Sequence, residues 1–186
     1  MFNWLATAWL RAFGGRPAFR VYGRARCEPV WRTIDVFATS RRDMDSRWPA
    51  PFFRGTCITR SAAAIAVGRD FAADVLREQA DAPASRQRPV EVRGGRIRDA
   101  ERRRAAGADP WPSASEVLAH ECGHTWQARR LGFLYLPCGA LFTLYREGPH
   151  RRNWFENQAS EFGQFGGIVN DSVDPDLAAH VLTKPR

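Results

Sequence analysis

The chain contains almost no lysine, although it is strongly basic. Lys184 is the single lysine among 28 basic residues, and the formal net charge is +8. Such a charge is typical of proteins that bind nucleic acid or an anionic membrane surface. A basic composition made almost wholly of arginine, without a recognisable reading motif, instead indicates a solvated arginine-rich surface. We therefore expect no specific nucleic acid as a partner, and a basic nucleic-acid-associated protein is kept as an alternative function.

The chain also lacks paired cysteines and a long apolar run. None of the four cysteines belongs to a C-x-x-C pair, so we expect reduced thiols rather than a disulfide framework. Residues 1–13 are apolar but have no basic segment before them and no clear cleavage site, so a secretory signal is not expected. The longest apolar run, residues 131–145, is too short to cross a bilayer. These absences favour a cytoplasmic protein, with peripheral membrane contact through residues 1–13 or 131–145 as an option.

What is present indicates one domain. A length of 186 residues and a hydrophobic fraction of 44% are sufficient for a single folded core. We expect a single domain over residues 1–186. It comprises an N-terminal amphipathic helix over residues 1–16, a long exposed connection rich in Arg and Pro over residues 80–113, and a core segment over residues 113–165.

Hydrophobic periodicity predicts an α+β fold. Residues 31–37, WRTIDVF, favour a strand or a short helix, and residues 55–67 favour two short strands joined by a turn. Residues 69–79 are predicted to form a helix, and residues 153–165 a second one that ends at a pair of glycines. The expected architecture is a small sheet of two or three strands with helices packed against it.

The clearest single element is a helix that begins at Ser113 and ends at Gly132. Residues 113–116, SASE, have the S-x-x-E form of a capping box. A glycine directly after the last periodic residue is a typical helix stop. Within this helix, residues 120–124 read HECGH, which is an H-E-x-x-H motif.

The spacing of this motif points to metal chemistry. His120 and His124 lie one turn apart on the same helix face, so both imidazoles can bind one metal ion. Glu121 lies about 100° around the helix, where it reaches a metal-bound water rather than the metal. A catalytic zinc site uses three protein ligands and one water, whose pKa the ion lowers to roughly 7. We therefore predict Zn²⁺ as cofactor, with Glu121 as the catalytic base.

The third ligand must come from outside the motif. A metzincin would have a glycine and a third histidine where this chain has Gln127 and Arg130, so that class is excluded. A glutamate on a following helix is the alternative, and Glu156 is far enough downstream for the chain to turn back. Glu161, on a different side of the same predicted helix, and His150 remain competing candidates.

The motif region resembles a known group of metallopeptidases. HECGHTWQARRLGFLYLP is similar to bacterial domains with HEYGHTxQSxxxGxLYLP and a later W-T-E-x-x-A-N element, on the gluzincin side of the zincins. The matching residues are His120, Glu121, Gly123, His124, Thr125, Gln127, Gly132, Leu134, Tyr135, Leu136, Pro137, Trp154, Glu156 and Ala159. The resemblance covers residues 118–165 and departs at Cys122, Phe155 and Ser160, where the group has Tyr, Thr and Asn. It implies a zincin-like fold and a zinc peptidase, and leaves the substrate open.

Together these features predict a single metallopeptidase-like domain, with its zinc-binding core over residues 113–165. Its predicted function is that of a zinc-dependent metallohydrolase that cleaves a peptide or protein substrate. Tyr135, Tyr145 and His150 are candidate transition-state stabilisers by analogy with other zincins. Residues 134–145 are expected to form one wall of the cleft beside the zinc ion, with core packing as the alternative. The main alternative function is a non-catalytic zinc-binding interaction module, and the intact Glu121 argues against it.

Overall fold

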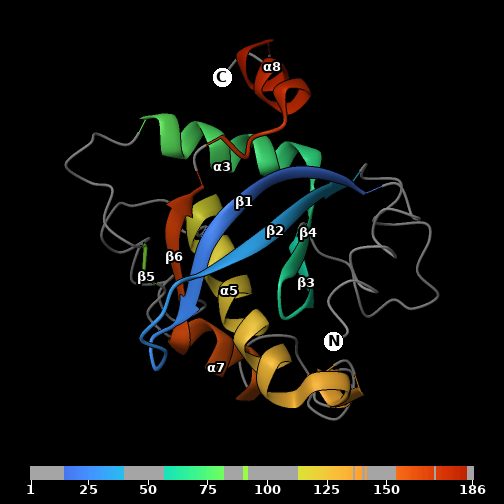
Figure 1. The fold of residues 1–186 in the computed structure, drawn as a ribbon, viewed down its shortest axis with the longest axis vertical. Coiled ribbons are helices and arrows are strands. Elements are labelled where there is room, and N and C mark those ends of the chain that lie inside the picture. The colour runs from blue at the N-terminus through green and yellow to red at the C-terminus, as the bar shows by residue number, and fades with distance from the viewer. Residues whose placement is uncertain are drawn as a thin grey trace, which may run out of the picture.

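The structure, a computed structural model, describes residues 15–39, 57–81, 90–91, 113–135, 137–139, 141, 154–169 and 171–183. In this part of the chain, six strands form one mixed sheet, and helices lie behind it and across one end (Figure 1). The strands are β1 (Arg16–Ala25), β2 (Arg32–Thr39), β3 (Cys57–Ser61), β4 (Ala64–Gly68), β5 (Val90–Glu91) and β6 (Gly163–Ile168). The helices are α3 (Arg69–Asp81), α5 (Ala114–Leu131), the 3-10 helix η3 (Gly132–Leu134), α7 (Trp154–Phe162) and α8 (Pro175–Thr183).

The order of the strands places β1 near the middle of the sheet. The order is β3-β4-β2-β1-β6-β5, with β2 and β4 parallel and all other neighbours antiparallel. Val21 of β1 lies opposite Ile34 of β2, and Ala25 of β1 lies opposite Gly163 of β6. Because β6 begins at the residue after α7 ends, its pairing with β1 fixes α7 beside the sheet.

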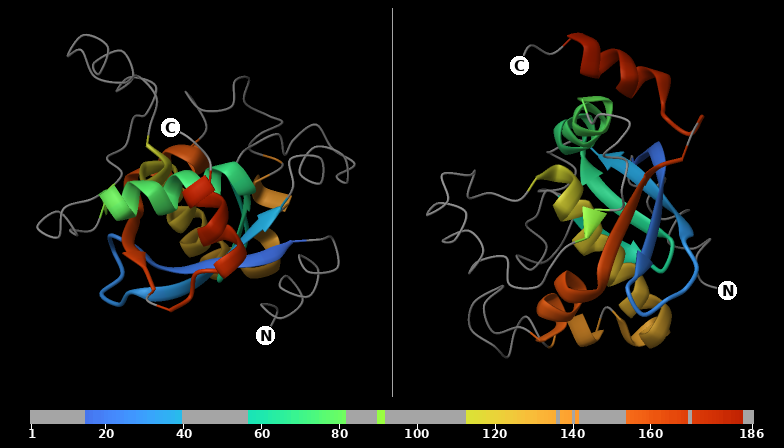
Figure 2. Two further views of the ribbon diagram at one scale, coloured as in Figure 1. Left: turned by 90° about the horizontal axis from the view of Figure 1, so that it is seen from above. Right: turned by 90° about the vertical axis from the view of Figure 1, so that its left-hand side faces the viewer.

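Helix α5 packs along one face of the sheet (Figure 2). Side chains alternate between the two faces of a strand, and Val21 and Ile34 belong to the same buried cluster as Leu118 and Cys122 of α5. Phe37, which the alternation places on the opposite face from Val36, belongs to a separate cluster. Full burial of one such aliphatic side chain contributes about 1.5–3 kcal/mol, so the main cluster holds α5 firmly against the sheet.

The N-terminus of α5 is held by two sets of hydrogen bonds. Ser113 Oγ accepts from the backbone N–H of Glu116 at 3.2 Å, and the Glu116 carboxylate accepts from the N–H of Ser113 at 2.8 Å, which completes the predicted capping box. Glu78 of α3 accepts from the N–H groups of Ala114 and Ser115 at 2.8 and 2.9 Å. Negative charge is favourable at this end of a helix, so α3 both caps and positions α5.

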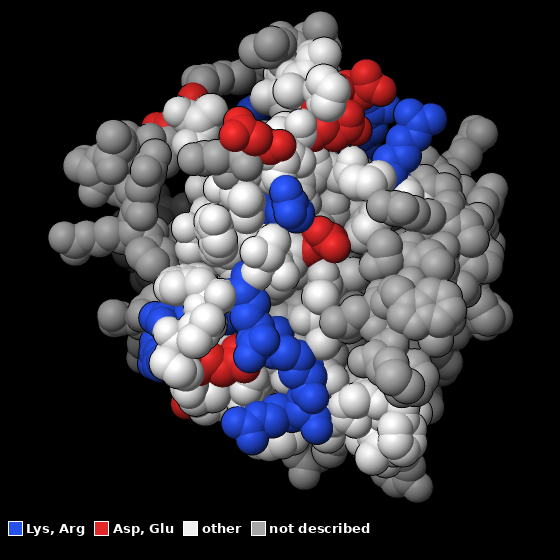
Figure 3. Space-filling view, in the orientation of Figure 1, with Lys and Arg blue, Asp and Glu red and all other residues white. Residues whose placement is uncertain are grey.

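Several arginines have structural partners. Figure 3 shows basic side chains gathered in the lower part of the face that it displays, next to acidic ones. Arg24 lies over the ring of Trp31, 4.5 Å from its centroid, and donates to Gln164 Oε1 at 2.6 Å. Arg129, near the end of α5, pairs with Glu28 at 2.6 Å. These contacts favour structural and solvating roles for arginine, and the absence of specific nucleic-acid binding stays a prediction.

The α+β class predicted from the sequence is confirmed. Strands β3 and β4 are the two predicted within residues 55–67, and residues 31–37 lie almost wholly in β2. Helix α3 matches the helix predicted for residues 69–79, and α5 begins and ends where the capping box and Gly132 predict.

The predicted sheet of two or three strands was too small. The helix predicted for residues 153–165 ends at Phe162, and residues 163–168, GQFGGI, form β6. Three glycines disfavour a strand on propensity alone, but a Cβ at Gly166 would lie 2.8 Å from the ring of Trp31. Tertiary packing therefore requires a small residue there and overrides the propensity.

The other corrections concern segments at the edges of the predicted elements. Arg16, expected to end the N-terminal helix, begins β1 instead, because β1 pairs on both sides with β2 and β6. Val90–Glu91, expected in an exposed connection, pairs with β6 as β5. Helix α8, which lies against α3 (Figure 2), was not predicted. The rest of the segments 1–16 and 80–113 lies outside the described residues, apart from residues 15, 80, 81 and 113.

Gly123 and Gly163 allow the backbones of α5, α7 and β6 to come into direct contact. A Cβ at Gly123 in α5 would overlap the carbonyl group of Ala159 in α7. A Cβ at Gly163 would overlap the carbonyl oxygen of Ala119 and would lie 2.9 Å from the backbone nitrogen of Gly123. Backbone atoms cannot swing aside as the end of a side chain can, so a larger residue would force the elements apart. The contact places Glu156, three residues before Ala159, against the H-E-x-x-H segment.

We expect Gly123→Ala to destabilise the protein. Replacing glycine by alanine inside a helix ordinarily stabilises it by about 1 kcal/mol. Here the added methyl group meets the α7 backbone, so we expect a loss of about 1–3 kcal/mol, the usual cost of overpacking. Chemical denaturation measures this change. Gly139→Ala is the control, because its Cβ would make an ordinary 3.6 Å contact with the Phe155 ring. A Gly123→Ala variant as stable as the wild type would contradict the close approach.

Candidate metal centre

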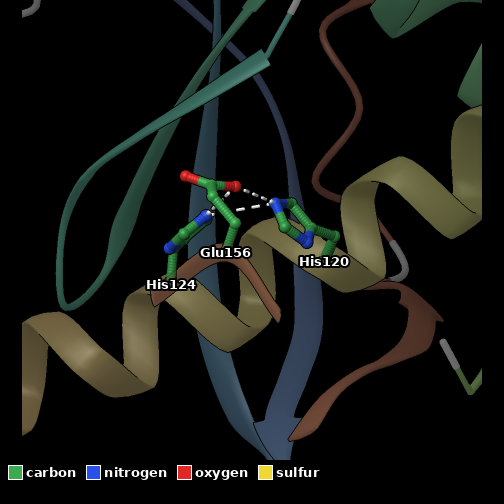
Figure 4. Close-up of side chains that lie close together, drawn as sticks. All are labelled: His120, His124 and Glu156. Carbon is green, nitrogen blue, oxygen red and sulfur yellow. Dashed lines mark hydrogen bonds and ion pairs between the residues drawn. The ribbon is translucent and has the colours of Figure 1, made fainter. Parts of the chain in front are cut away.

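His120 and His124 lie one turn apart on α5, and Glu156 reaches them from α7 (Figure 4). The Nε2 atoms of the two histidines are 3.1 Å apart. Glu156 Oε2 lies 3.0 Å from His120 Nε2 and 3.3 Å from His124 Nε2. Three ligand atoms from three side chains therefore converge on one point, and this group can hold a metal ion.

The fold encloses this group. His120 and His124 are 7% and 6% exposed, and the Glu156 side chain is 22% exposed. Enclosure lowers the effective dielectric constant and strengthens the attraction between the carboxylate and a cation. Of the three side chains, Glu156 keeps the most contact with solvent.

Each histidine is oriented through its other ring nitrogen. His120 Nδ1 lies 2.8 Å from the hydroxyl oxygen of Ser160 on α7. His124 Nδ1 lies 2.7 Å from the amide oxygen of Gln127 on α5. Histidines that bind metals commonly use their second nitrogen in this way, which fixes the orientation of the ring. Both Nε2 atoms are thereby directed toward the same point.

The histidine and glutamate side chains favour one another's charged forms. Burial lowers the pKa of His124, but the hydrogen bond to Glu156 and the charges of Glu121 and Glu156 outweigh burial, so this pKa is raised overall. Burial raises the pKa of Glu156, but its hydrogen bonds to His120 and His124 outweigh burial and hold this pKa well below its usual value. Glu156 is therefore anionic at neutral pH, as a metal ligand must be.

The remaining motif residues have different surroundings. Glu121 is 6% exposed, and its negative charge helps to raise the pKa of His124, so its carboxylate acts electrostatically on the site. Cys122 is fully buried in the main core, and burial, followed by the charge of Glu121, raises the pKa of its thiol. Cys122 is therefore a neutral core residue and not a thiolate ligand.

The other predicted site residues are only partly described. Glu161 is exposed on α7 and does not belong to the group formed by the two histidines and Glu156. His150 and Tyr145 lie outside the described residues. Tyr135 is 9% exposed, and its ring centroid is 6.4 Å from that of His124. Tyr135 thus packs beside the site, and its role as a transition-state stabiliser stays a prediction.

The apolar run over residues 131–145 is exposed in several of its described positions. Phe133, Leu134 and Leu141 are 80%, 46% and 53% exposed, whereas Tyr135 is buried. These exposures favour a surface role over core packing alone, and both the cleft wall and the membrane contact stay predictions. Among the described residues, no helix has the length and apolar character needed to cross a membrane. Residues 1–13 lie outside the described part of the chain.

Two supporting roles were not predicted from the sequence. Gln127 lies three residues after His124, and this helical spacing is the signal that could have identified it as a partner. Gly163, at the start of β6, had no local signal, because its role depends on the distance between two helices. Ser160 occupies the position of the Asn expected from the resemblance and still contacts His120.

Comparison of the chain with protein-family models, curated proteins and solved structures gives no match. The resemblance to the gluzincins therefore rests on the motif residues.

The metal-free protein should show a stability optimum set by the contact between His124 and Glu156. The contribution of Glu156 to the stability of the folded state is present above its usual pKa of 4.5. This contribution is lost as the pH falls through the lowered pKa that Glu156 has in the folded state. The contribution of His124 to the stability of the folded state is fully present below its usual pKa of 6.5. This contribution is lost as the pH rises through the raised pKa that His124 has in the folded state. The difference in melting temperature between the wild type and Glu156→Gln should therefore be largest between about pH 4.5 and 6.5. A constant difference from pH 4 to 9 would show that the two groups do not interact as described.

Proposed function

We propose that this chain is a zinc-dependent hydrolase that cleaves peptide or amide bonds, most simply in a peptide or protein substrate. The observation that carries the proposal is the convergence of His120 Nε2, His124 Nε2 and Glu156 Oε2, each within 3.3 Å of the other two. The helix that bears both histidines also carries a buried glutamate directly after the first of them.

The donor set and its spacing support zinc. Two imidazoles and one carboxylate form the ligand set of a recognised class of catalytic zinc site, with a fourth position left for water. Ligands at about 2.0–2.1 Å from a tetrahedral zinc ion are about 3.3–3.4 Å apart. The ligand atoms of this site are 3.0, 3.1 and 3.3 Å apart, so a small expansion accommodates the ion. Calcium would need about six to eight oxygen ligands, which this nitrogen-rich set does not resemble.

The residues around the site fit distinct steps of hydrolysis. When bound, zinc lowers the pKa of a coordinated water to roughly 7 and polarises the substrate carbonyl. Glu121 lies about 100° around α5 from His120, so its carboxylate can take the proton of the attacking water and pass it to the leaving amine. Glu156 keeps the most solvent contact of the three ligands, so in this proposal the substrate approaches from its side.

The alternative is a zinc-binding interaction module without catalysis. Such a site needs the three ligands but no base. Burying a carboxylate costs free energy that must be compensated, so the burial of Glu121 supports a chemical role. A nucleic-acid-associated function would rest on the net charge alone.

We expect the purified protein to bind one zinc ion per chain. Replacing His120, His124 or Glu156 by alanine removes one of three ligands, so each variant should lose most of its bound zinc. Elemental analysis after dialysis measures the metal content. Glu161→Ala is the matched control, because Glu161 lies on the same helix and is exposed. If Glu161→Ala lost zinc while Glu156→Ala kept it, the third ligand would be Glu161.

Glu121→Gln should keep the zinc ion and the fold but lose hydrolysis. Glutamine is nearly isosteric with glutamate and cannot accept the proton, so we expect the rate to fall by about 10²–10⁴-fold. An unbiased peptide library supplies the substrates, and mass spectrometry of the products measures cleavage. Glu161→Gln serves as the control and should cleave normally. Full activity in Glu121→Gln would refute the mechanism, and loss of zinc would make Glu121 a ligand.

A further inference from the structure

Gln127 is buried beside the metal centre, and both polar atoms of its side chain have partners. It lies on α5 and is 2% exposed. Its Oε1 is 2.7 Å from His124 Nδ1. Its Nε2 donates to the backbone carbonyl of Phe155 at 2.8 Å and to Gln158 Oε1 at 3.0 Å. The amide thus connects a histidine on α5 to the backbone of α7 at the residue before Glu156.

The direction of these hydrogen bonds follows from the carbonyl of Phe155. A backbone carbonyl can only accept a hydrogen bond, so the atom of Gln127 that faces it must be the amide nitrogen. The amide oxygen then faces His124, and an amide oxygen also can only accept. In the neutral ring, His124 Nδ1 is therefore the nitrogen that carries the proton. The neutral ring then carries its lone pair on His124 Nε2, which faces the metal position and can accept a hydrogen bond from His120 Nε2, 3.1 Å away. His124 Nε2 donates to Glu156 only when both ring nitrogens are protonated.

The partner of the other histidine does not impose such a direction. The hydroxyl of Ser160 can donate or accept a hydrogen bond, so its contact with His120 Nδ1 is compatible with either neutral form of that ring. The Gln127 amide cannot reverse without turning its oxygen toward the Phe155 carbonyl, which would place two acceptors against each other in a buried position. An unsatisfied buried polar group costs about 1–3 kcal/mol. Of the two groups that contact the histidine Nδ1 atoms, Gln127 is therefore the one that fixes the direction of its hydrogen bond.

We propose that Gln127 is a positioning residue that holds His124 in the Nδ1–H tautomer before a metal ion binds. This inference rests on the proposed metal-binding function of the site. The proposal also explains why this amide is buried. The Gln127 side chain contacts His124 and also bonds to the carbonyl of Phe155, the residue before Glu156. Gln127 thus makes the two helices act as one binding unit.

The tautomer can be read directly in the metal-free, full-length protein. Long-range ¹H–¹⁵N correlation spectra of the histidine side chains distinguish the two neutral tautomers, at a pH where the ring of His124 is neutral by its own titration. The wild type and Gln127→Glu, whose carboxylate also accepts from Nδ1, should show the Nδ1–H form. Gln127→Met has a side chain of similar length but no acceptor oxygen, so the Nε2–H form should become populated. A wild-type His124 in the Nε2–H form would overturn the proposal.

Zinc affinity gives a second, independent readout. Competition with a chelator should show a dissociation constant raised about 10–100-fold in Gln127→Met, the usual effect of losing a partner of a metal-binding histidine. Gln127→Glu keeps an acceptor for His124 Nδ1 but places an oxygen against the Phe155 carbonyl, so its affinity should fall as well. Gln158→Met is the matched control: it removes only one acceptor of the Gln127 amide and should bind zinc as the wild type does. Wild-type affinity in Gln127→Met would overturn the proposal.

The outcomes separate this inference from the proposed function. The tautomer is measured without metal or substrate, so a zinc-loaded protein that cleaves nothing would refute hydrolysis and leave the role of Gln127 intact. Conversely, an active zinc protein with His124 in the Nε2–H form before loading would refute the role of Gln127 alone. If Gln127→Met does not fold, the wild-type tautomer and the Gln127→Glu variant decide the question.

Discussion

The contact between the backbones of α5 and α7 is the constraint on which the metal centre depends. Helices packed through ordinary side chains lie about 8–10 Å apart, whereas Gly123 and Gly163 admit no Cβ at this contact. A glutamate side chain reaches only a short distance from its own helix, so Glu156 meets both histidines only when the two helices touch. The glycine in the second half of the H-E-x-x-H segment therefore serves the ligand set without touching the metal position.

The rest of the fold keeps α5 from moving away from this contact. The apolar side of α5 packs against the sheet, and Glu78 and Ser113 accept hydrogen bonds from its N-terminus. Near its C-terminus, Arg129 forms an ion pair with Glu28. A metal centre requires ligand positions kept to within a fraction of an ångström, and ligands on rigid elements meet that requirement better than ligands on loops. A preformed site also loses less conformational entropy when the ion binds.

Elements with strong local signals were predicted well, and elements that depend on distant partners were not. The helix α5 followed from its capping box, its periodicity and Gly132, all of which act within a few residues. Residues 163–165 of strand β6 were predicted as the end of a helix that stops at Gly166 and Gly167, and three glycines within residues 163–168 disfavour a strand. The conformation of β6 comes from pairing with β1 and from the close neighbours of Gly163 and Gly166. Local propensity could not contain that information, since β1 and Trp31 are more than a hundred positions away from β6, and Ala119 and Gly123 are about forty positions away from Gly163.

The sequence by itself determined that His120 and His124 share one helix face and that Glu121 follows the first of them, because helical geometry relates residues four apart wherever the helix lies. It left the third ligand open among Glu156, Glu161 and His150. Only the tertiary structure decided which described carboxylate meets the histidines, because the rotation of α7 against α5 is set by the β6 pairing and by backbone contact between the helices. The partners of the two histidine Nδ1 atoms were decided in the same way. Ser160 lies on α7, and the direction of the hydrogen bond between Gln127 and His124 depends on the carbonyl of Phe155, which α7 brings to α5.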